Sequence, residues 1–304
     1  MKAILFRLIA IPCLALWTGG CGYDQVVQSW FNHSIDSAAP ANEKMPGHAY
    51  LLRGVAGDIY SLGLDQLADK INHTGLIATV HGVSEYSSLS DEIIRKYKAG
   101  EDRGPIVLLG HSSGGDAIIA MAQRLKEANV PVALAFGFDP TRIVGTVPSN
   151  VALFINLYQR NNPIGGGQVS PDPDFRGRLI NIDLREHTEI VHITLEKTAA
   201  IQNAVAAKIA VAASVAQQAK TGKQPDPDAD LLPLMLKYTV PREASIELWD
   251  SAVKVKVKPG ETLELIASTY GAPSWAIAQI NTVGSDQTIE PGRTLIVPRS
   301  LYTD

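Results

Sequence analysis

The sequence has almost no cysteine, since Cys13 and Cys21 are its only two. Cys13 lies inside an apolar run that starts at Leu8 near the N-terminus. Removal of this run by cleavage before Cys21 would leave a single cysteine, so no internal disulfide could form. Stability must then come from an apolar core, which a chain of 304 residues is long enough to bury.

Clustered charge of one sign is also absent. Lysine and arginine number 27 against 31 aspartate and glutamate, which gives a formal net charge of -4, and the basic residues are scattered. A nucleic-acid-binding surface needs concentrated positive charge, so we expect no nucleic-acid partner. The N-terminal apolar run from Leu8 to Trp17 is too short to span a bilayer as a permanent helix.

Residues 1–21 have the layout of a secretory signal, and we expect the protein to be exported to the periplasm or cell envelope. Basic residues precede the apolar run and small residues follow it. The small residues directly before Cys21 resemble a bacterial lipoprotein cleavage site, which implies a lipid anchor on Cys21. Thr18 stands where that family prefers an aliphatic residue, so lipidation and plain cleavage with release both stay open.

The pattern changes after a polar spacer at residues 22–47. From 48 to 220, apolar runs of strand length alternate with amphipathic stretches of helix length. This alternation predicts an α/β domain, in which a mostly parallel sheet carries helices on both faces. The expected strands are Ala49–Leu52, Leu76–His81, Ile106–Leu109, Val132–Phe138, Val151–Leu157 and Leu179–Leu184.

The stretches between these runs predict helices, and the pattern after them predicts a second domain. Residues 221–252 lose the periodicity and contain four prolines among acidic residues, which indicates a linker. Residues 253–298 then predict a strand, two short helices and a final strand. The expected helices of the large domain are Leu62–Asn72, Asp91–Lys98 behind an N-cap at Ser90, Asp116–Ala128, and an alanine-rich helix over 194–218 that closes the domain.

The C-terminal pattern carries a family resemblance. The segment ValLysProGlyGluThrLeu at 257–263 is followed by Ile266, Ala267, Tyr270 and Gly271, and then by Asn281, Ile289, Pro291, Gly292, Leu295, Val297 and Pro298. Residues 253–298 therefore resemble a LysM domain. The resemblance implies a small βααβ fold that binds glycans containing N-acetylglucosamine, such as peptidoglycan. By position, the implied groove residues are Gly260, Glu261, Thr262, Leu263, Asn281 and Ile289.

Two roles stay open within this module. Leu263 fits the small core as well as it fits the glycan groove. Trp275 and Trp249 could stack on a sugar face or anchor packing.

A GxSxG pattern at 110–114 is the main chemical signal of the large domain. It follows an expected strand directly and precedes the helix that starts near Asp116. This setting is what a nucleophile elbow requires, because a side chain at Gly110 or Gly114 would clash with the neighbouring strand and helix. The domain therefore resembles an α/β-hydrolase. The resemblance implies an esterase or lipase-like enzyme with Ser112 as nucleophile, and we expect neither a cofactor nor a metal.

In that family the acid follows the serine along the chain. Asp139 ends an expected strand and is followed by Pro140, so we expect its carboxylate at the carboxyl edge of the sheet. The commonest layout of the family places the acid after the next strand, but the stretch 159–164 offers no carboxylate. The alternatives to Asp139 are Asp172, Asp174 and Asp183.

The base also follows the serine, and we expect it to be His192. This histidine comes after the last expected strand and directly before the closing helix, and His187 is the alternative. A zinc site on these two histidines is disfavoured. Their spacing is too long for the metalloprotease helix signature, and no third histidine or cysteine stands nearby.

The glycine-flanked stretch 52–58 ends the first strand, as a loop that supplies part of an oxyanion hole should. We expect backbone donors from Val55 or Ala56 together with Ser113. The alternative is a plain turn with a salt-bridging Arg53. The segment 161–177, rich in glycine and proline, is a candidate lid or rim of the acyl pocket.

Three functions fit these observations. The first is a cell-envelope serine hydrolase of the esterase, lipase or thioesterase type, acting on an acyl ester through Ser112, Asp139 and His192 and held on peptidoglycan by the LysM module. The alternative is a non-catalytic peptidoglycan-binding envelope protein whose hydrolase-like domain is a scaffold. The third is an enzyme that cleaves an acetyl ester or amide on peptidoglycan itself.

Overall fold

The computed structural model describes residues 45–220, 234–284 and 288–300. The signal at 1–21, the candidate lipidation site at Cys21 and almost all of the spacer lie outside the described residues. Within the described part of the chain, no helix is long and apolar enough to cross a membrane.

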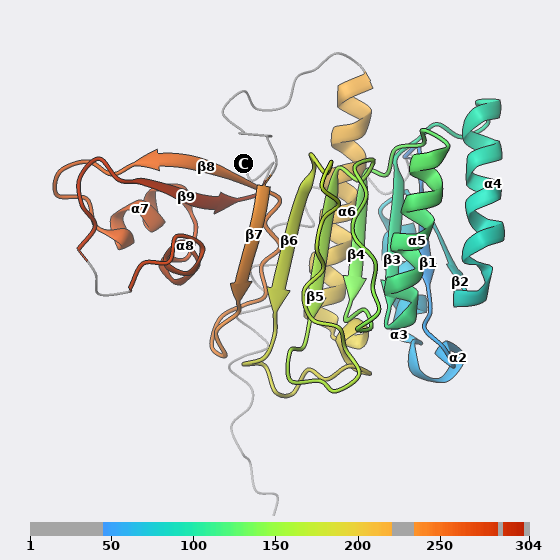
Figure 1. Cartoon of the computed structure of the whole chain (residues 1–304), viewed down its shortest axis with the longest axis horizontal. Coiled ribbons are helices and arrows are strands. Elements are labelled where there is room, and N and C mark those ends of the chain that lie inside the picture. The colour runs from blue at the N-terminus through green and yellow to red at the C-terminus, as the bar shows by residue number, and fades with distance from the viewer. Residues whose placement is uncertain (1–44, 221–233, 285–287, 301–304) are drawn as a thin grey trace, which may run out of the picture. The chain divides into compact units, whose positions relative to one another are not determined.

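The large domain is built on a seven-stranded sheet in which all strands are parallel, in the order β2-β1-β3-β4-β5-β6-β7 (Figure 1). Parallel strands end at the same edge of a sheet, so the loops that follow them gather at one carboxyl edge. The strands are β1 His48–Leu52, β2 Ile77–His81, β3 Ile106–His111, β4 Leu134–Phe138, β5 Leu153–Tyr158, β6 Arg178–Asp183 and β7 Leu234–Thr239.

Helices cover both faces of this sheet, which confirms the predicted fold class. Helices α3 (Gly63–His73) and α6 (Ala199–Lys220) pack on one face, where Leu51 and Leu109 point. Helices α4 (Tyr86–Ala99) and α5 (Ser113–Glu127) pack on the other face, against alternate residues of the same strands such as Leu52 and Leu108. Because both faces are covered, every residue of the central strands is buried, and these strands appear in the sequence as continuous apolar runs.

Two expectations about elements are wrong. Helix α4 begins at Tyr86, not after Ser90, because Ser90 is buried and its hydroxyl donates to the Tyr86 carbonyl at 2.7 Å. The segment 221–252, expected to be a linker, contains β7, the seventh strand of the sheet. Leu236 and Tyr238 are buried on that strand while Met235 and Lys237 are exposed, which is the pattern of a strand with one covered face.

The C-terminal domain has the predicted βααβ order. Strand β8 (Ser251–Lys256) pairs antiparallel with β9 (Thr294–Arg299), and the two short helices α7 (Leu263–Tyr270) and α8 (Ser274–Ile280) lie between them in sequence. Its core is separate from the two cores of the large domain and contains Leu263, Ile266 and Ile277.

Trp249 and Trp275 serve packing. Their rings lie 5.9 Å apart between centroids, and both contact the ring of Tyr238, at 4.8 and 6.0 Å. Beside them, Gln279 exchanges two hydrogen bonds with the backbone of Thr239, at 2.8 and 2.9 Å. An aromatic cluster of this kind buries a large apolar area and holds α8 against β7.

Candidate active site and glycan-binding module

Ser112 lies on a strained turn between β3 and α5. Its backbone has φ 56° and ψ -127°, outside the regions that L-residues prefer. The turn depends on its glycines, because a Cβ on Gly110 would lie 2.1 Å from the Gly114 carbonyl oxygen. A Cβ on Gly114 would lie 2.1 Å from the Leu52 carbonyl oxygen. The glycines therefore let strand, turn and helix come close enough to present the serine at the carboxyl edge.

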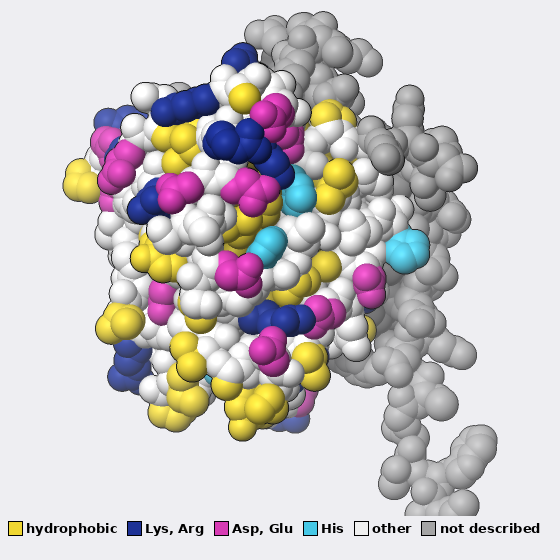
Figure 2. Space-filling view, turned by 90° about the vertical axis from the view of Figure 1, so that its right-hand side faces the viewer, with side chains coloured by type: hydrophobic (Ala, Val, Ile, Leu, Met, Phe, Trp, Pro, Cys, Tyr) yellow, Lys and Arg dark blue, Asp and Glu magenta, His cyan; other side chains and the backbone are white. Residues whose placement is uncertain are grey.

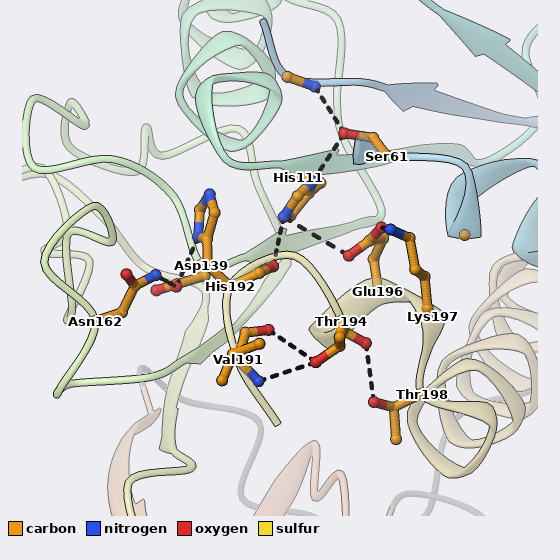
Figure 3. Close-up of polar contacts among 12 residues, drawn as sticks. Ser61, His111, Asp139, Asn162, Val191, His192, Thr194, Glu196, Lys197 and Thr198 are labelled. Atoms are coloured by element: carbon orange, nitrogen blue, oxygen red, sulfur yellow. Dashed lines mark hydrogen bonds and ion pairs between the residues drawn. The ribbon is translucent and has the colours of Figure 1, made fainter. Parts of the chain in front are cut away.

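Asp139 and His192 lie together at the same edge (Figure 3). The His192 Nδ1 atom is 2.8 Å from Asp139 Oδ2, and the aspartate is fully buried. Since a carboxylate only accepts hydrogen bonds, Nδ1 carries a proton, so Nε2 is the nitrogen that can act as a base. Asp139 also accepts from Asn162 Nδ2 at 2.7 Å and from the backbone amide of Gln159 at 3.3 Å. Three donors therefore hold one carboxylate.

The Ser112 hydroxyl makes no hydrogen bond to His192 within the described part of the chain. The connection between them runs through His111, the residue directly before the serine. His111 Nε2 lies 2.8 Å from the His192 carbonyl oxygen, and the two imidazole rings are 4.8 Å apart between centroids. In unliganded sites such hydroxyl-to-histidine bonds are often long and tighten only when substrate binds.

His111 begins a buried chain of hydrogen bonds that reaches the loop after β1. Because a carbonyl only accepts, Nε2 of His111 donates to His192, and its Nδ1 accepts from the Ser61 hydroxyl at 2.8 Å. The Ser61 oxygen in turn accepts from the Gly54 amide at 3.3 Å. Burial lowers the pKa of His111 to about 4, which keeps the ring neutral and this direction of bonding intact at neutral pH.

Glu196 lies beside this chain and is fully buried. Its Oε2 is 3.7 Å from His111 Nε2 and its Oε1 is 3.8 Å from Lys197 Nζ, and neither oxygen has a hydrogen bond to another described residue. Burial raises the pKa of this carboxyl to about 7. A buried carboxyl whose protonated form is favoured by burial therefore lies beside His111.

The loop after β1 lies against the serine turn. A Cβ on Gly54 would be 3.0 Å from Ser112 Cβ, so only glycine lets this loop approach so closely. The Val55 amide donates to Ser113 Oγ at 2.9 Å, whereas the Ser113 amide belongs to the first turn of α5 and has no partner within the helix. Arg53 pairs with Asp58 at 2.9 Å and with Asp65 at 2.5 Å, which fixes the base of the loop.

Backbone strain is concentrated in three loops at the carboxyl edge of the sheet, those after β1, β3 and β4. Of the five non-glycine residues with positive φ among the described residues, Ala56, Ser112 and Asp139 belong to them, with φ values of 55°, 56° and 48°. Such conformations cost roughly 1–3 kcal/mol each and persist where the surroundings enforce them, most often at functional sites.

The alternative acid and base residues have other partners. His187 lies between Glu189 and the Pro241 carbonyl oxygen, at 3.2 and 3.0 Å. Asp172 and Asp174 pair with Lys126, and Asp183 pairs with Arg185. The described residues also contain no group of three or more side chains that could hold a metal ion.

Neither the contact of Asn162 with Asp139 nor the packing of the segment 161–177 on that aspartate is predicted by the sequence. A Cβ on Gly165 would lie 2.2 Å from Asp139 Oδ1, and the Gly166 amide donates to the Pro140 carbonyl at 2.5 Å. The segment that we expected to act as a lid or rim therefore packs directly against the Asp139 carboxylate and the backbone of Pro140. The only sequence signal for this was its three consecutive glycines at 165–167.

In the C-terminal domain, several of the residues carried over to the glycan groove have structural partners. Leu263 and Ile289 are buried in the small core. Asn281 bonds the backbone of Ile277 and Ile296, with its Oδ1 accepting from the Ile296 amide at 2.7 Å. The other residues predicted for the groove, Gly260, Glu261 and Thr262, form a turn in which Gly260 has φ +81° and open space at its Cβ position. Glu261 accepts from the Lys258 amide at 2.8 Å, and Thr262 caps α7 by accepting from the Leu265 amide.

Comparison with known proteins agrees with this description of the C-terminal domain. Residues 255–298 match the LysM domain family, so the chain contains a LysM domain there. LysM domains bind glycans that contain N-acetylglucosamine, such as peptidoglycan, and indicate association with the cell wall or envelope. Comparison with curated proteins gave no significant match.

Two solved structures are among those similar to the chain. One is a candidate hydrolase of the alpha/beta superfamily from Xanthomonas campestris pv. campestris, 16% identical, which covers 58% of this chain and 99% of its own, with a TM-score of 0.30. The other is ESTFA in its Fe-lacking apo form, 9% identical, covering 71% and 82%, with a TM-score of 0.27. Both scores are low, so neither likeness bears on the reaction or the substrate.

Proposed function

We propose that the large domain is a serine hydrolase that cleaves carboxylic esters at the cell envelope, and that the LysM domain holds it on peptidoglycan. The observation that carries the proposal is the 2.8 Å contact between Asp139 and His192, next to a serine held in a strained turn at the same sheet edge. A nucleophile, a base and a group that orients the base are the minimum for acyl transfer through a serine.

In this mechanism, the Ser112 oxygen attacks the carbonyl carbon of the ester and its proton passes to His192 Nε2. The carbonyl π-electrons move to the oxygen, which forms a tetrahedral oxyanion. Collapse of this intermediate breaks the bond to the alcohol, which leaves with the proton from His192. Water then attacks the acyl-enzyme in the same way, with His192 as base, and releases the acid and free Ser112.

Asp139 supports this cycle by holding the histidine in one tautomer. Its carboxylate accepts from Nδ1, so the imidazolium that forms during attack is stabilised by a charge at hydrogen-bond distance. The bonds from Asn162 and Gln159 keep the carboxylate in the orientation that the histidine needs.

The oxyanion would be held by the Ser113 amide together with an amide of the loop after β1. The Ala56 amide is the second donor that we favour, since the Val55 amide donates to Ser113 Oγ in this structure. Two such donors aimed at developing negative charge contribute several kcal/mol to the transition state, because one donor alone is worth about 3–4 kcal/mol.

An activity-based probe tests the proposal. A fluorophosphonate reacts only with an activated serine, so the full-length protein should be labelled and should hydrolyse p-nitrophenyl acetate, whereas Ser112→Ala should do neither. Ser88→Ala is the matched control, because Ser88 is exposed and lies on α4. Equal silence of the unaltered protein and Ser112→Ala would contradict catalysis and support the scaffold alternative. Release of acetate from purified sacculi but not from simple esters would instead favour a wall-modifying enzyme.

A further inference from the structure

A groove of about 600 Å³ lies along α5 and begins at Ser113, the residue next to the candidate nucleophile. The loop after β2, the outer face of α5 and the loop after β4 form its walls, and all three meet at the carboxyl edge of the sheet. We call it the α5 groove. Its apolar lining comes from Val83, Tyr86, Ala117, Ile119, Ala120 and Ile143.

The groove is open because two alanines face it. Ala117 and Ala120 are three residues apart, so they share one side of α5 and leave room where longer side chains would fill the space. Ala117 is itself buried, and Ala120 is half-buried.

Three of the polar side chains that line the groove, those of Asp116, Gln123 and Thr146, already have partners in the protein. Both carboxylate oxygens of Asp116 bond Thr141, one to its amide at 2.9 Å and one to its hydroxyl at 2.5 Å. The Gln123 amide nitrogen lies 3.1 Å from the Thr146 carbonyl oxygen and 3.2 Å from Asp172 Oδ2. Most of the groove lining is apolar, and an apolar chain needs no hydrogen bonds from it.

The surroundings of the groove are also apolar. Of the thirteen large hydrophobic side chains that are exposed among the described residues, nine lie on loops and helix starts at the carboxyl edge. In Figure 2 the lower end of the molecule, where the strands of Figure 1 terminate, carries many hydrophobic side chains. Single exposed apolar residues are common on proteins, but their concentration beside one site indicates contact with apolar material. These nine are Val55, Ile59, Tyr60, Leu62, Tyr86, Ile143, Ile164, Val191 and Ile193.

We propose that the α5 groove binds the acyl chain of the ester that Ser112 attacks, so that the substrates are esters of unbranched apolar acids. This inference rests on the proposed function, because the groove meets the reacting carbonyl only if Ser112 is the nucleophile. The groove begins at Ser113, beside that serine, and we assign its occupant to the acyl side of the ester bond, which the chain-length profile below tests directly. The source of the chain can be a dissolved ester or an ester within aggregated lipid.

A chain-length profile tests the groove. We would measure kcat/KM of the full-length protein for p-nitrophenyl acetate, butyrate and octanoate, and repeat this with Ala120→Phe, which fills the groove. Each methylene kept out of an apolar site costs roughly a factor of four, so the octanoate-to-acetate ratio should fall at least about 10-fold. Glu127→Phe is the matched control, because it adds the same ring to an exposed position on α5. An unchanged ratio in Ala120→Phe would overturn the proposal.

A second variant guards against misfolding of the first. Gly145→Leu narrows the groove from the opposite wall, and its melting temperature can be compared with that of the unaltered protein. If both variants fold and neither changes the ratio, the groove does not bind the acyl chain. To identify the source of the chain, we would measure the hydrolysis rate of p-nitrophenyl octanoate at concentrations below and above its solubility limit. A sharp rise in rate above the limit indicates that the enzyme acts on aggregated lipid, and simple saturation indicates that it acts on the dissolved ester.

Binding separates failure of the groove from failure of catalysis. Ser112→Ala should bind a dansyl-labelled undecanoate with saturable fluorescence, and adding Ala120→Phe should weaken this binding at least about 10-fold by the same methylene argument. A protein that reacts with fluorophosphonate but shows neither chain-length preference nor binding keeps the proposed function and loses the groove. A protein that is silent to fluorophosphonate yet binds the fatty acid in the groove keeps the groove as a lipid site and loses catalysis.

Discussion

His111 donates from Nε2 to the backbone carbonyl of His192, over a distance of 2.8 Å. The residue before the candidate nucleophile therefore positions the backbone of the candidate base. Through Nδ1 the same ring accepts from Ser61, whose oxygen accepts from the Gly54 amide in the loop after β1. One imidazole therefore connects three parts of the proposed site: the loop after β1, the serine turn after β3 and the segment that carries His192.

This linkage predicts that Ser61→Ala weakens both stability and catalysis. The substitution removes the partner of His111 Nδ1 and of the Gly54 amide, both in buried surroundings, so unfolding should cost about 1–3 kcal/mol less free energy. We expect kcat for p-nitrophenyl acetate to fall about 10-fold with little change in KM, because the loops lose their alignment and no substrate contact is removed. Urea unfolding and steady-state kinetics measure the two effects.

The comparison for that variant is Ser88→Ala, which removes an exposed hydroxyl. If Ser61→Ala lost stability but retained the kcat of the unaltered protein, His111 would have a purely structural role.

Asn162 provides a second prediction, since its side-chain amide donates to Asp139 at 2.7 Å. In Asn162→Ala the buried carboxylate loses one of three donors and gains freedom to rotate away from His192. We expect kcat to fall roughly 10- to 100-fold, the range typical for removal of a group that supports a reacting residue. Asn161→Ala, one residue earlier and exposed, should match the unaltered protein in both kcat and melting temperature.

Glu196 gives a prediction about pH and stability. The pKa of this carboxyl is about 7 in the folded protein and near 4.5 in the unfolded chain, so folding favours its protonated form. Its contribution is fully present below about pH 4.5 and is lost as the pH rises to about 7, which amounts to about 3 kcal/mol. Glu196→Gln cannot ionise, so its stability relative to the unaltered protein should rise by about this amount between about pH 4 and about pH 8.

The difference between the two proteins is the useful quantity, because His111 acts in the opposite direction. Burial lowers the pKa of His111 to about 4, so its contribution is present above about pH 6.5 and is lost as the pH falls. Subtracting the free energies of unfolding of the two proteins at each pH removes the part of this effect that does not depend on the contact between Glu196 and His111. Glu127→Gln, on an exposed glutamate, should give a flat difference. A flat difference for Glu196→Gln would mean that Glu196 is ionised in the folded protein at neutral pH.

The sequence predicted most of the fold because buried parallel strands leave a strong signal. Six strands were found from their apolar runs, and the turn at Ser112 from glycines that the structure requires. Strand β7 was missed because only alternate residues such as Leu236 and Tyr238 are buried, between flanking prolines. Ser90 misplaced the start of α4, because a buried serine that bonds one turn back has the same sequence appearance as an N-cap.

The parts of the site that could not be predicted are contacts between loops far apart in sequence. The bonds from Asn162 to Asp139 and from Ser61 to His111 join residues 23 and 50 positions apart. No sequence pattern around Ser61 or Asn162 identifies such a partner, because a single polar residue in a loop is compatible with many neighbours. The acid and the base were proposed from their places at strand ends, which the α/β topology determines.

The LysM domain supports a last prediction, in which binding and stability are separated. Deleting residues 253–304 should abolish retention on purified sacculi.

Asn281→Ala should act differently, because Asn281 joins α8 to β9 through hydrogen bonds to the backbone at 2.7 and 2.8 Å. Losing these buried bonds should lower the stability of the small domain by about 1–3 kcal/mol, so binding should fail only on warming. Glu261→Ala, at a half-buried position of the turn, should instead weaken retention at all temperatures and lower the melting temperature less than Asn281→Ala does, because it removes one hydrogen bond, from the Lys258 amide at 2.8 Å. A sedimentation assay on sacculi at two temperatures, run with each variant, distinguishes the two effects, and equal retention by Glu261→Ala would place the glycan on another surface of the domain.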